Sequence, residues 1–445
     1  MSRSGILLII CWITHAQTGQ PITIDYTYLI NATGYSNGFK VIPAGSFNTD
    51  TIYAVYAYTE ESLYFAYSYD QGETWQKMYL SATPWNNGRF PSLDHYNRVP
   101  YVVCEGDSAG KGEIFLKCPF DPKPPIRISY TPGHSTLPAI IIDKNGKMHI
   151  VFQDNTPGNW EIYYCGYDTS PSDTYNLSQN SIATDIYPSI SLYNGDEIHV
   201  IWERYDPSSY SPYRIVHRYL KDGVWSDEEF IGGPSYRPLH HPSLDYAKGE
   251  DDISAAWEDS SSGNLEAYFY RGNGGGYSTP GQSRYPVIST VGKTWSYLYW
   301  EDNSGGKDDI FAHRYYFMMG WWDYRFRDYY GDQNVHHPSV SGCYVLWTQG
   351  DHPPYQVRFV DEEYPIQTGE EAATHSIHFS PNPFRDQVRI THIPGEIEIY
   401  DVNGKRIRTL SRGLWDGRDE DGHEVAPGIY LLRSGGATVK LVKID

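Results

Sequence analysis

The chain repeats a short pattern, a bulky residue and a proline followed by an apolar strand, and this internal repeat restricts its fold more than any other feature. The prolines recur at intervals of 44 to 54 residues. They are Pro43, Pro91, Pro138, Pro188, Pro242, Pro286 and Pro338. Seven copies in register predict one structural unit that occurs seven times.

A second column of residues has the same period. In every copy a second strand follows the proline strand and ends on one large or apolar residue: Tyr56, Cys104, Phe152, Trp202, Trp257, Trp300 and Trp347. Third strands follow, for example "EIYYCGY" and "DIFAHRY". Four short antiparallel strands in about 40 to 50 residues are typical of one blade of a β-propeller. The sequence therefore predicts an all-β chain in which residues 17–362 form a seven-bladed β-propeller.

The two ends of this repeat are expected to meet. The last unit runs out after three strands, near Asp361, while "PITIDYTYLI" at Pro21–Ile30 precedes the first unit. We predict that this N-terminal strand completes the seventh blade and closes the ring, because closure removes an open sheet edge.

The N-terminus is typical of an export signal. Arg3, the apolar run "ILLIICWI" and the small Ala16 predict a signal peptide over residues 1–16, and the run is too short to span a bilayer. The cysteines beyond it are Cys104, Cys118, Cys165 and Cys343. In an exported protein these cysteines can form disulfides or remain buried thiols, and their spacing matches no zinc motif.

Composition excludes one class of partner. The chain has 55 acidic and 35 basic residues and a net charge of -20, which would repel phosphate backbones. We therefore expect no nucleic acid partner. The 41 tyrosines, 41 glycines and 29 prolines suit short strands that are joined by turns.

The stretch "YFAYSYDQGETWQK" predicts a tight hairpin. A short Asp side chain can accept bonds from backbone N–H groups, and glycine can take a positive φ. The residues of the pattern are Ser68, Asp70, Gly72, Thr74 and Trp75. Their spacing resembles the Asp-box of sialidases and related β-propellers. That resemblance implies a structural turn that lies away from any active site.

The last part of the chain follows another pattern. After a linker at residues 363–375, residues 376–445 alternate apolar and polar side chains, with an Asn403-Gly404 turn. This predicts a small immunoglobulin-like β-sandwich.

Four segments of this module carry a resemblance: "PNPF", "IYDVNGKRI", "WDGRDEDGHEVAPGIYLLR" and the basic terminal strand "KLVKI". They resemble the C-terminal sorting domain of proteins that the type 9 secretion system exports, and the related module of flagellar hook-capping proteins. The resemblance implies that the type 9 machinery is a partner and that the protein is secreted or held at the cell surface. An accessory sandwich without a sorting role is the alternative.

Candidate site residues come from the propeller pattern. The residues just before each proline and just after each second-strand column residue are expected to share one rim around the central channel. The charged candidates are Arg89, Arg284, Glu203, Glu258, Asp259, Glu301 and Asp302. Phe90 and Tyr285 could stack on a sugar ring.

Two of these candidates carry a further resemblance. Arg89 in "RFP" and Arg284 in "RYP" resemble the Arg-Ile-Pro element of sialidases, which implies a role in binding a substrate carboxylate. No motif assigns the other arginines, the Tyr-Glu nucleophile or the Asp that a sialidase requires. The sequence therefore leaves open whether the protein is an enzyme.

The acidic candidates have alternative roles. They could cap turns, bind Ca²⁺ as the one cofactor considered, or accept hydrogen bonds from sugar hydroxyls. In the pairs His240-His241 and His336-His337, neighbouring strand residues point to opposite faces, so at most one of each pair can face a common site.

The function predicted from the sequence is that of an exported surface or extracellular protein that binds glycans or proteins. The alternative is a secreted sialidase-like glycoside hydrolase or lyase. A purely structural role would follow if side chains plugged the channel mouth.

Overall fold

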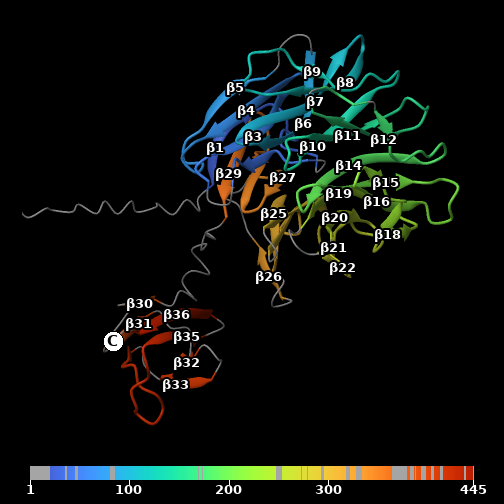
Figure 1. Ribbon diagram of the computed structural model, residues 1–445. Helices are drawn as coiled ribbons and strands as arrows, with labels where there is room; N and C mark the ends of the chain where they lie inside the picture. The colour runs from blue at the N-terminus through green and yellow to red at the C-terminus, as the bar shows by residue number, and fades with distance from the viewer. Residues whose placement is uncertain are drawn as a thin grey trace, which may run out of the picture. The chain divides into compact units, whose positions relative to one another are not determined.

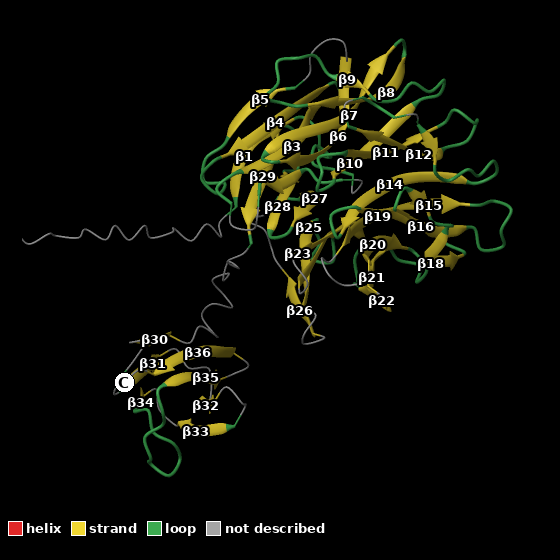
Figure 2. Cartoon of the chain, in the orientation of Figure 1, coloured by secondary structure: helices red, strands yellow, loops and turns green. Residues whose placement is uncertain are grey.

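The computed structural model of the chain describes residues 21–35, 38–45, 49–80, 86–168, 170–172, 174–246, 253–271, 273–277, 279–291, 295–316, 321–326, 333–362, 378–380, 385, 387–391, 397–401, 405–410, 414–434 and 437–443. Within these residues the regular elements are all strands, which confirms the all-β class (Figure 2). Among them we find no apolar helix of membrane-spanning length. The predicted signal peptide and linker lie outside the described residues.

The chain divides into two compact units, Met1–Tyr364 and Pro365–Asp445. In the described part of the first unit the strands form seven antiparallel sheets (Figure 1). The first three are β2(Val41–Pro43), β3(Ile52–Thr59), β4(Ser62–Ser68) and β5(Gln76–Tyr79); β6(Asn86–Tyr96), β7(Val99–Ser108), β8(Lys111–Lys117) and β9(Ile126–Arg127); β10(Ser135–Ile142), β11(Met148–Asp154), β12(Glu161–Tyr167) and β13(Tyr175–Asn176).

The remaining sheets follow the same order. The next three are β14(Thr184–Tyr193), β15(Glu197–Tyr205), β16(Tyr213–Lys221) and β17(Val224–Trp225), with β18(Glu229–Ser235) also on β16; β19(Leu239–Tyr246), β20(Ile253–Asp259), β21(Glu266–Arg271) and β22(Asn273–Tyr277); β23(Ser283–Val291), β24(Trp295–Asp302), β25(Asp309–Tyr316) and β26(Trp321–Phe326). The last sheet joins both ends of the unit: β1(Ile22–Thr27), β29(Tyr355–Asp361), β28(Tyr344–Gln349) and β27(Val335–Ser341).

From the sheet β2–β5 to the sheet β23–β26, each sheet packs on the next through apolar side chains. Val55 and Phe65 of the sheet β2–β5 form one cluster with Leu93 and Val102 of the sheet β6–β9, and similar clusters follow along the chain. Another cluster joins the sheet β2–β5 to the sheet that holds β27–β29. The second-strand column predicted from the sequence, from Tyr56 to Trp347, is buried at every position. First and last sheets therefore meet, as in a β-propeller.

The N-terminal strand pairs where the sequence predicts. β1 is antiparallel to β29, with Ile22 opposite Phe359 and Thr27 opposite Tyr355 (Figure 1). Asp25 of β1 accepts a hydrogen bond from the Tyr56 hydroxyl at 2.5 Å and forms an ion pair with Lys77. These contacts tie β1 to the sheet β2–β5 as well as to its own, so the expected pairing of this strand with the last sheet is confirmed.

The inner strands share a local distortion at the repeated proline. In six sheets the residue before the proline has a positive φ of 49° to 53°, and the strand register shifts there. These residues are Phe90, Leu137, Tyr187, His241, Tyr285 and His337. We call them the bulge residues. Because one extra residue is inserted, the side chain alternation changes at this point of each strand.

The predicted hairpin joins β4 to β5. Asp70 Oδ1 accepts the N–H of Thr74 at 2.9 Å, the Ser68 hydroxyl accepts the N–H of Gly72 at 2.8 Å, and Gly72 has φ +88°. Trp75 Nε1 donates to the Gly72 carbonyl at 2.9 Å, and its ring lies 5.0 Å from that of Phe359. The turn lies at the sheet end where β3 begins, because Gln71 N donates to the Asp50 carbonyl.

Replacing Asp70 with alanine should lower the free energy of unfolding by about 1 to 2 kcal/mol without changing any ligand affinity. Burial would raise the pKa of Asp70, but hydrogen bonds from Thr74 and Ser68 outweigh it and lower the pKa. The stabilisation is therefore present at neutral pH and is lost as the pH falls through the folded-state pKa. Urea unfolding of both proteins at neutral and acidic pH measures this; a binding defect in folded Asp70→Ala would contradict it.

The four cysteines beyond the predicted signal peptide are thiols, and Cys104, Cys165 and Cys343 are buried. Of the two states expected for them, the structure therefore shows the thiol and not the disulfide. Cys343 Sγ donates to Asp361 at 3.1 Å.

The second unit contains two sheets in its described part. One has the order β30(His378–Ser380), β31(Val388–Thr391), β34(Leu414–Trp415), and the other β33(Arg406–Leu410), β32(Ile397–Asp401), β35(Gly428–Ser434), β36(Ala437–Lys443). Val388 and Trp415 of the first sheet share one apolar cluster with Ile399 and Leu432 of the second. The "PNPF" segment and the Asn403-Gly404 turn lie outside the described residues.

Candidate functional site

The acidic column predicted after the second strands makes contacts between neighbouring sheets. Glu258 Oε1 accepts the backbone N–H of Tyr285 at 2.7 Å, and Glu301 Oε2 accepts that of His337 at 3.1 Å. Gln153 does the same for Tyr187 at 3.0 Å. In each case the side chain reaches from a second strand to the bulge residue of the next sheet. We call these contacts the inter-sheet ties.

Glu203 also reaches the next sheet, but through a side chain. Its Oε1 lies 2.8 Å from His240 Nδ1. Burial alone would lower the pKa of His240, but the Glu203 carboxylate raises it above its usual value. His240 therefore carries positive charge against Glu203 over a wider pH range than an isolated histidine.

The two predicted arginines are each paired with two carboxylates. Arg284 Nη2 lies 2.7 Å from Glu301 Oε1 and 2.5 Å from Asp308 Oδ1. Arg89 makes the same pattern with Glu105 at 2.5 Å and Asp107 at 2.8 Å. Such double pairing is typical of a structural ion pair. A guanidinium that recognised a substrate carboxylate would first have to leave these partners.

Replacing Arg284 with alanine should therefore destabilise the fold. Glu301 would remain buried without its cation, which costs several kcal/mol for fully buried pairs. Because the Arg284 side chain is 32% exposed, we expect about 2 kcal/mol, after allowing for solvent screening. Urea unfolding measures the loss, with the exposed Arg237→Ala as the control that should change little. Equal stability of the two variants would contradict the structural role.

Asp259 and Asp302 cap turns, which is one of the alternative roles expected for the acidic candidates. Asp259 accepts the N–H of Ser261 at 2.7 Å. Asp302 accepts the hydroxyls of Thr279 and Ser283, each at 2.7 Å. Asp302 also accepts the N–H of Ser304 in its own turn at 2.8 Å, so the oxygens of both acids are engaged within their own sheets.

One group of potential metal ligands lies in this region. Oxygen or nitrogen atoms of Glu301, Asp308 and His336 lie within 4.8 Å of one another. The Arg284 guanidinium lies against both of the carboxylates, at 2.7 and 2.5 Å. A Ca²⁺ ion would have to displace this cation, so the contacts favour an ion-pair network.

A cavity of about 560 Å³ opens where the bulge residues meet. We call it the central basin. Four bulge residues line it, Tyr187, His241, Tyr285 and His337. The other lining residues are Tyr28, Leu29, Ile30, Asn31, Tyr35, Glu60 and Tyr355. The segment between β1 and β2 thus borders the same cavity as the inner strands of four sheets.

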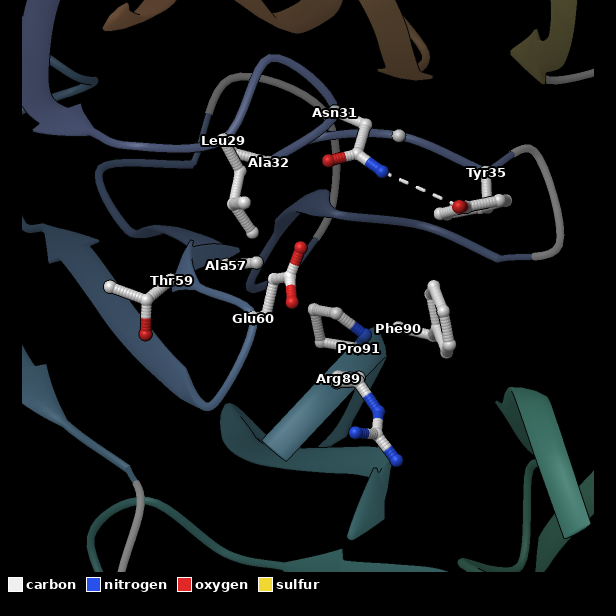
Figure 3. A pocket seen from close by; sticks show the side chains of 11 residues that line it. Leu29, Asn31, Ala32, Tyr35, Ala57, Thr59, Glu60, Arg89, Phe90 and Pro91 are labelled. Atoms are coloured by element: carbon white, nitrogen blue, oxygen red, sulfur yellow. Dashed lines mark hydrogen bonds between the residues drawn. The ribbon is translucent and has the colours of Figure 1, made fainter. Parts of the chain in front are cut away.

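A smaller cavity of about 210 Å³ shares four residues with the basin, Leu29, Asn31, Tyr35 and Glu60 (Figure 3). It adds Arg89 and Phe90 from β6. Figure 3 shows the Arg89 guanidinium pointing away from the Glu60 carboxylate, and Asn31 donating to the Tyr35 hydroxyl.

The aromatic side chains of the basin form a row. Ring centroids are 4.7 Å apart for Tyr187 and His241, 5.1 Å for His241 and Tyr285, and 4.1 Å for Tyr285 and His337. Tyr35 meets Phe90 edge to face at 4.8 Å. Flat apolar rings that carry polar groups suit the stacking of a sugar.

Burial sets the charge of these rings. Burial, helped by nearby carboxylates of which Glu203 contributes most, raises the pKa of Tyr187 to about 12. Burial also raises the pKa of Tyr285 and lowers the pKa of His337 to about 4. At neutral pH both phenols are therefore protonated and His337 is uncharged. A raised tyrosine pKa does not suit a tyrosinate nucleophile.

The channel narrows beyond the basin. Further along the inner strands, a cavity of about 20 Å³ is lined by Ser189, Ser243 and Ser339 together with Gly38 and Phe39. The basin is therefore an open cavity, and side chains nearly fill the channel beyond it. A purely structural role was expected if side chains plugged the channel mouth, and the open basin does not meet that condition.

The predicted site is therefore only partly brought together. Arg284, Glu203, Glu258 and Glu301 lie behind or beside the basin residues, whereas Arg89 belongs to the smaller cavity. Sequence reasoning proposed Tyr285 but missed Tyr187 and the β1–β2 segment. The bulky residue before each proline was the sequence signal that could have identified Tyr187 as a basin residue.

No protein-family model and no curated protein matches the chain. Among solved structures it is similar to a puromycin-hydrolyzing peptidase of Mycobacterium tuberculosis, with 12% identity, TM-score 0.49, and coverage of 78% of this chain and 55% of that one. The chain thus spans about half of the peptidase. It is also similar to the polysaccharide lyase Uly1, with 7% identity, TM-score 0.48, and coverage of 79% of this chain and 94% of that one. A third similar structure is the β-propeller domain of the Trilobed protease from Pyrococcus furiosus, with 9% identity, TM-score 0.46, and coverage of 76% of this chain and 97% of that one. Similarities this distant carry no information about function.

Proposed function

We propose that this chain is an exported, seven-bladed β-propeller protein that binds a saccharide in the central basin. The observation that carries the proposal is the row of four rings, Tyr187, His241, Tyr285 and His337, along an open cavity of about 560 Å³. Small-molecule sites are typically concave, of about 300 to 1,000 Å³, and lined by aromatic side chains with a few polar groups.

The basin contacts favour binding over hydrolysis. A glycoside hydrolase typically uses two carboxyl groups that flank the scissile bond. Among the described residues that line the basin, Glu60 is the one carboxylate. Glu258 and Glu301 are 4% and 2% exposed. In the inter-sheet ties they accept the backbone N–H groups of Tyr285 and His337. These acids are thus held by the fold as acceptors of backbone hydrogen bonds.

The finer architecture belongs to the same proposal. Each of the seven sheets is one blade, β1 supplies the outer strand of the last blade, and the Asp70 turn is an Asp-box. The second unit is an immunoglobulin-like sorting domain that the type 9 secretion machinery recognises. Its two sheets around one apolar core support this interpretation.

The binding proposal is tested with an array of immobilised glycans, together with a panel of chromogenic glycosides. We expect retention on at least one class of glycan and no turnover. Hydrolysis of a glycoside would favour the alternative, a secreted glycoside hydrolase or lyase. A folded protein that binds no glycan on the array would overturn the proposal.

Deleting Ser376–Asp445 should leave a folded propeller that fails to reach the cell exterior. The second unit has its own apolar cluster, so the first unit loses no core residue of its own. Thermal unfolding of the truncated chain and its level in the culture medium measure the two parts of this prediction. A normal level in the medium would contradict the sorting role.

A further inference from the structure

The ring row of the basin is backed by carboxylates. Glu258 Oε1 lies 2.7 Å from the N–H of Tyr285 and 2.9 Å from His241 Nδ1. Glu301 Oε2 lies 3.1 Å from the N–H of His337. Three of the four ring residues, His241, Tyr285 and His337, therefore contact a buried carboxylate directly.

Positive charge near the row is scarce and already engaged. Arg284 is shared between Glu301 and Asp308, and His240 faces Glu203. The described residues that line the basin include no lysine or arginine, while the exposed Glu60 adds a further negative charge at the rim. Five carboxylates thus surround the row, with one guanidinium and the histidines His240, His241 and His336 as their partners.

The titratable rings respond to these acids. Burial is the main cause that raises the pKa of Tyr187 and of Tyr285. The next largest cause is the charge of Glu203 for Tyr187 and the charge of Glu258 for Tyr285. His337 has its pKa lowered to about 4, mainly by burial, and adds no positive charge at neutral pH. The buried Lys40, whose Nζ donates to the carbonyl of Tyr35, has its pKa lowered to about 7 by burial. The carboxylates around the row therefore outnumber the cations that are charged at neutral pH.

We infer that the saccharide taken by the basin carries a protonated amine, so that the preferred ligand is an amino sugar, and that the basin excludes acidic sugars. This inference rests on the proposed saccharide binding and names its ligand class. The aromatic faces of Tyr187 and Tyr285 attract a cation, and the carboxylates behind them reinforce the attraction. A sugar carboxylate would meet like charges and would find both nearby arginines already paired.

The test compares three oligosaccharides of equal length by titration calorimetry with the full chain. They are an oligomer of glucosamine, its N-acetylated counterpart and an oligomer of glucuronic acid. We expect the amine oligomer to bind about tenfold more tightly than the neutral one, because one cation–π contact backed by carboxylates is worth about that factor. The acidic oligomer should show no binding.

Two matched variants separate local charge from net charge. Glu60→Gln should reduce the preference for the amine over the neutral oligomer by about threefold, since it removes the exposed carboxylate of the rim. Glu73→Gln, an equally small change on the exposed Asp70 turn, should leave the preference unchanged.

The outcomes distinguish this inference from the function on which it rests. Equal binding of the amine and neutral oligomers, or tighter binding of the acidic one, would overturn the charge preference and leave saccharide binding in place. Failure of every saccharide to bind would overturn both. An unchanged preference in Glu60→Gln would place the cation away from the basin rim and would also overturn the inference.

Discussion

Replacing Tyr187 with asparagine is expected to weaken saccharide binding by about 30-fold, or roughly 2 kcal/mol, because the variant removes one stacking face and its buried apolar area. Asparagine is chosen because Tyr187 has φ 53°, a conformation that asparagine tolerates better than most residues. The Gln153 tie uses the backbone N–H of residue 187, so it should survive the substitution. Calorimetric titration with the saccharide found on the array measures the loss.

The control for this variant is Tyr210→Asn. Tyr210 is 87% exposed and contacts the ring of Tyr236, and neither residue lines the basin. Its affinity should match that of the parent chain. Parent-like affinity in Tyr187→Asn, with a circular dichroism spectrum that shows a folded chain, would move the site away from the basin.

Deleting Ile22–Thr27 is expected to have the largest effect on stability, a loss on the order of 5 kcal/mol, comparable to the whole stability of many domains. The deletion removes the partner of β29 and leaves the Asp25 contacts of Tyr56 and Lys77 unmade. It also exposes the ladder of β29 as a new sheet edge, which favours association between chains. Thermal unfolding and gel filtration measure the two consequences.

A single substitution on the same strand provides the control. The side chain of Tyr26 is 52% exposed, so Tyr26→Ala should unfold close to the temperature of the parent chain. If the truncated chain remained monomeric and unfolded at the parent temperature, the closing role of β1 would be wrong.

Much of the fold could be predicted from the sequence because its signals repeat. The proline column and the buried column from Tyr56 to Trp347 each mark one strand, and their common period fixes the order of strands in every unit. The closing strand followed from a missing fourth strand near Asp361. The Asp70 turn followed from local chemistry, although the Ser68 hydroxyl, and not Asp70, accepts the N–H of Gly72.

The site was harder to predict, and the bulge explains why. A period of two places neighbouring residues on opposite faces, and this holds for His240, which contacts Glu203, and His241, which lines the basin. An inserted residue, however, changes which positions after it face the channel, and the repeated proline marks the place of the insertion without showing that a residue is inserted.

The acidic column was misplaced for a different reason. Glu258 and Glu301 were expected on an open rim, but each accepts a backbone N–H from the next sheet. The partner is a main-chain group, which any residue type provides, so the contact leaves no pattern of paired residues in the sequence. Arg284 differs, because both of its partners are side chains, but the second of them, Asp308, lies in the loop before β25 and belongs to neither repeated column.

The inter-sheet ties bear on how a protein of this kind could change its ligand. Each tie holds position 187, 285 or 337 by its amide, so the scaffold specifies the backbone there and leaves the side chain to vary. The residues now at these positions are two tyrosines and a histidine, and the equivalent positions elsewhere hold phenylalanine, leucine and histidine. New specificities could therefore be selected one sheet at a time, by exchanging a single ring, while the architecture beneath it stays constant.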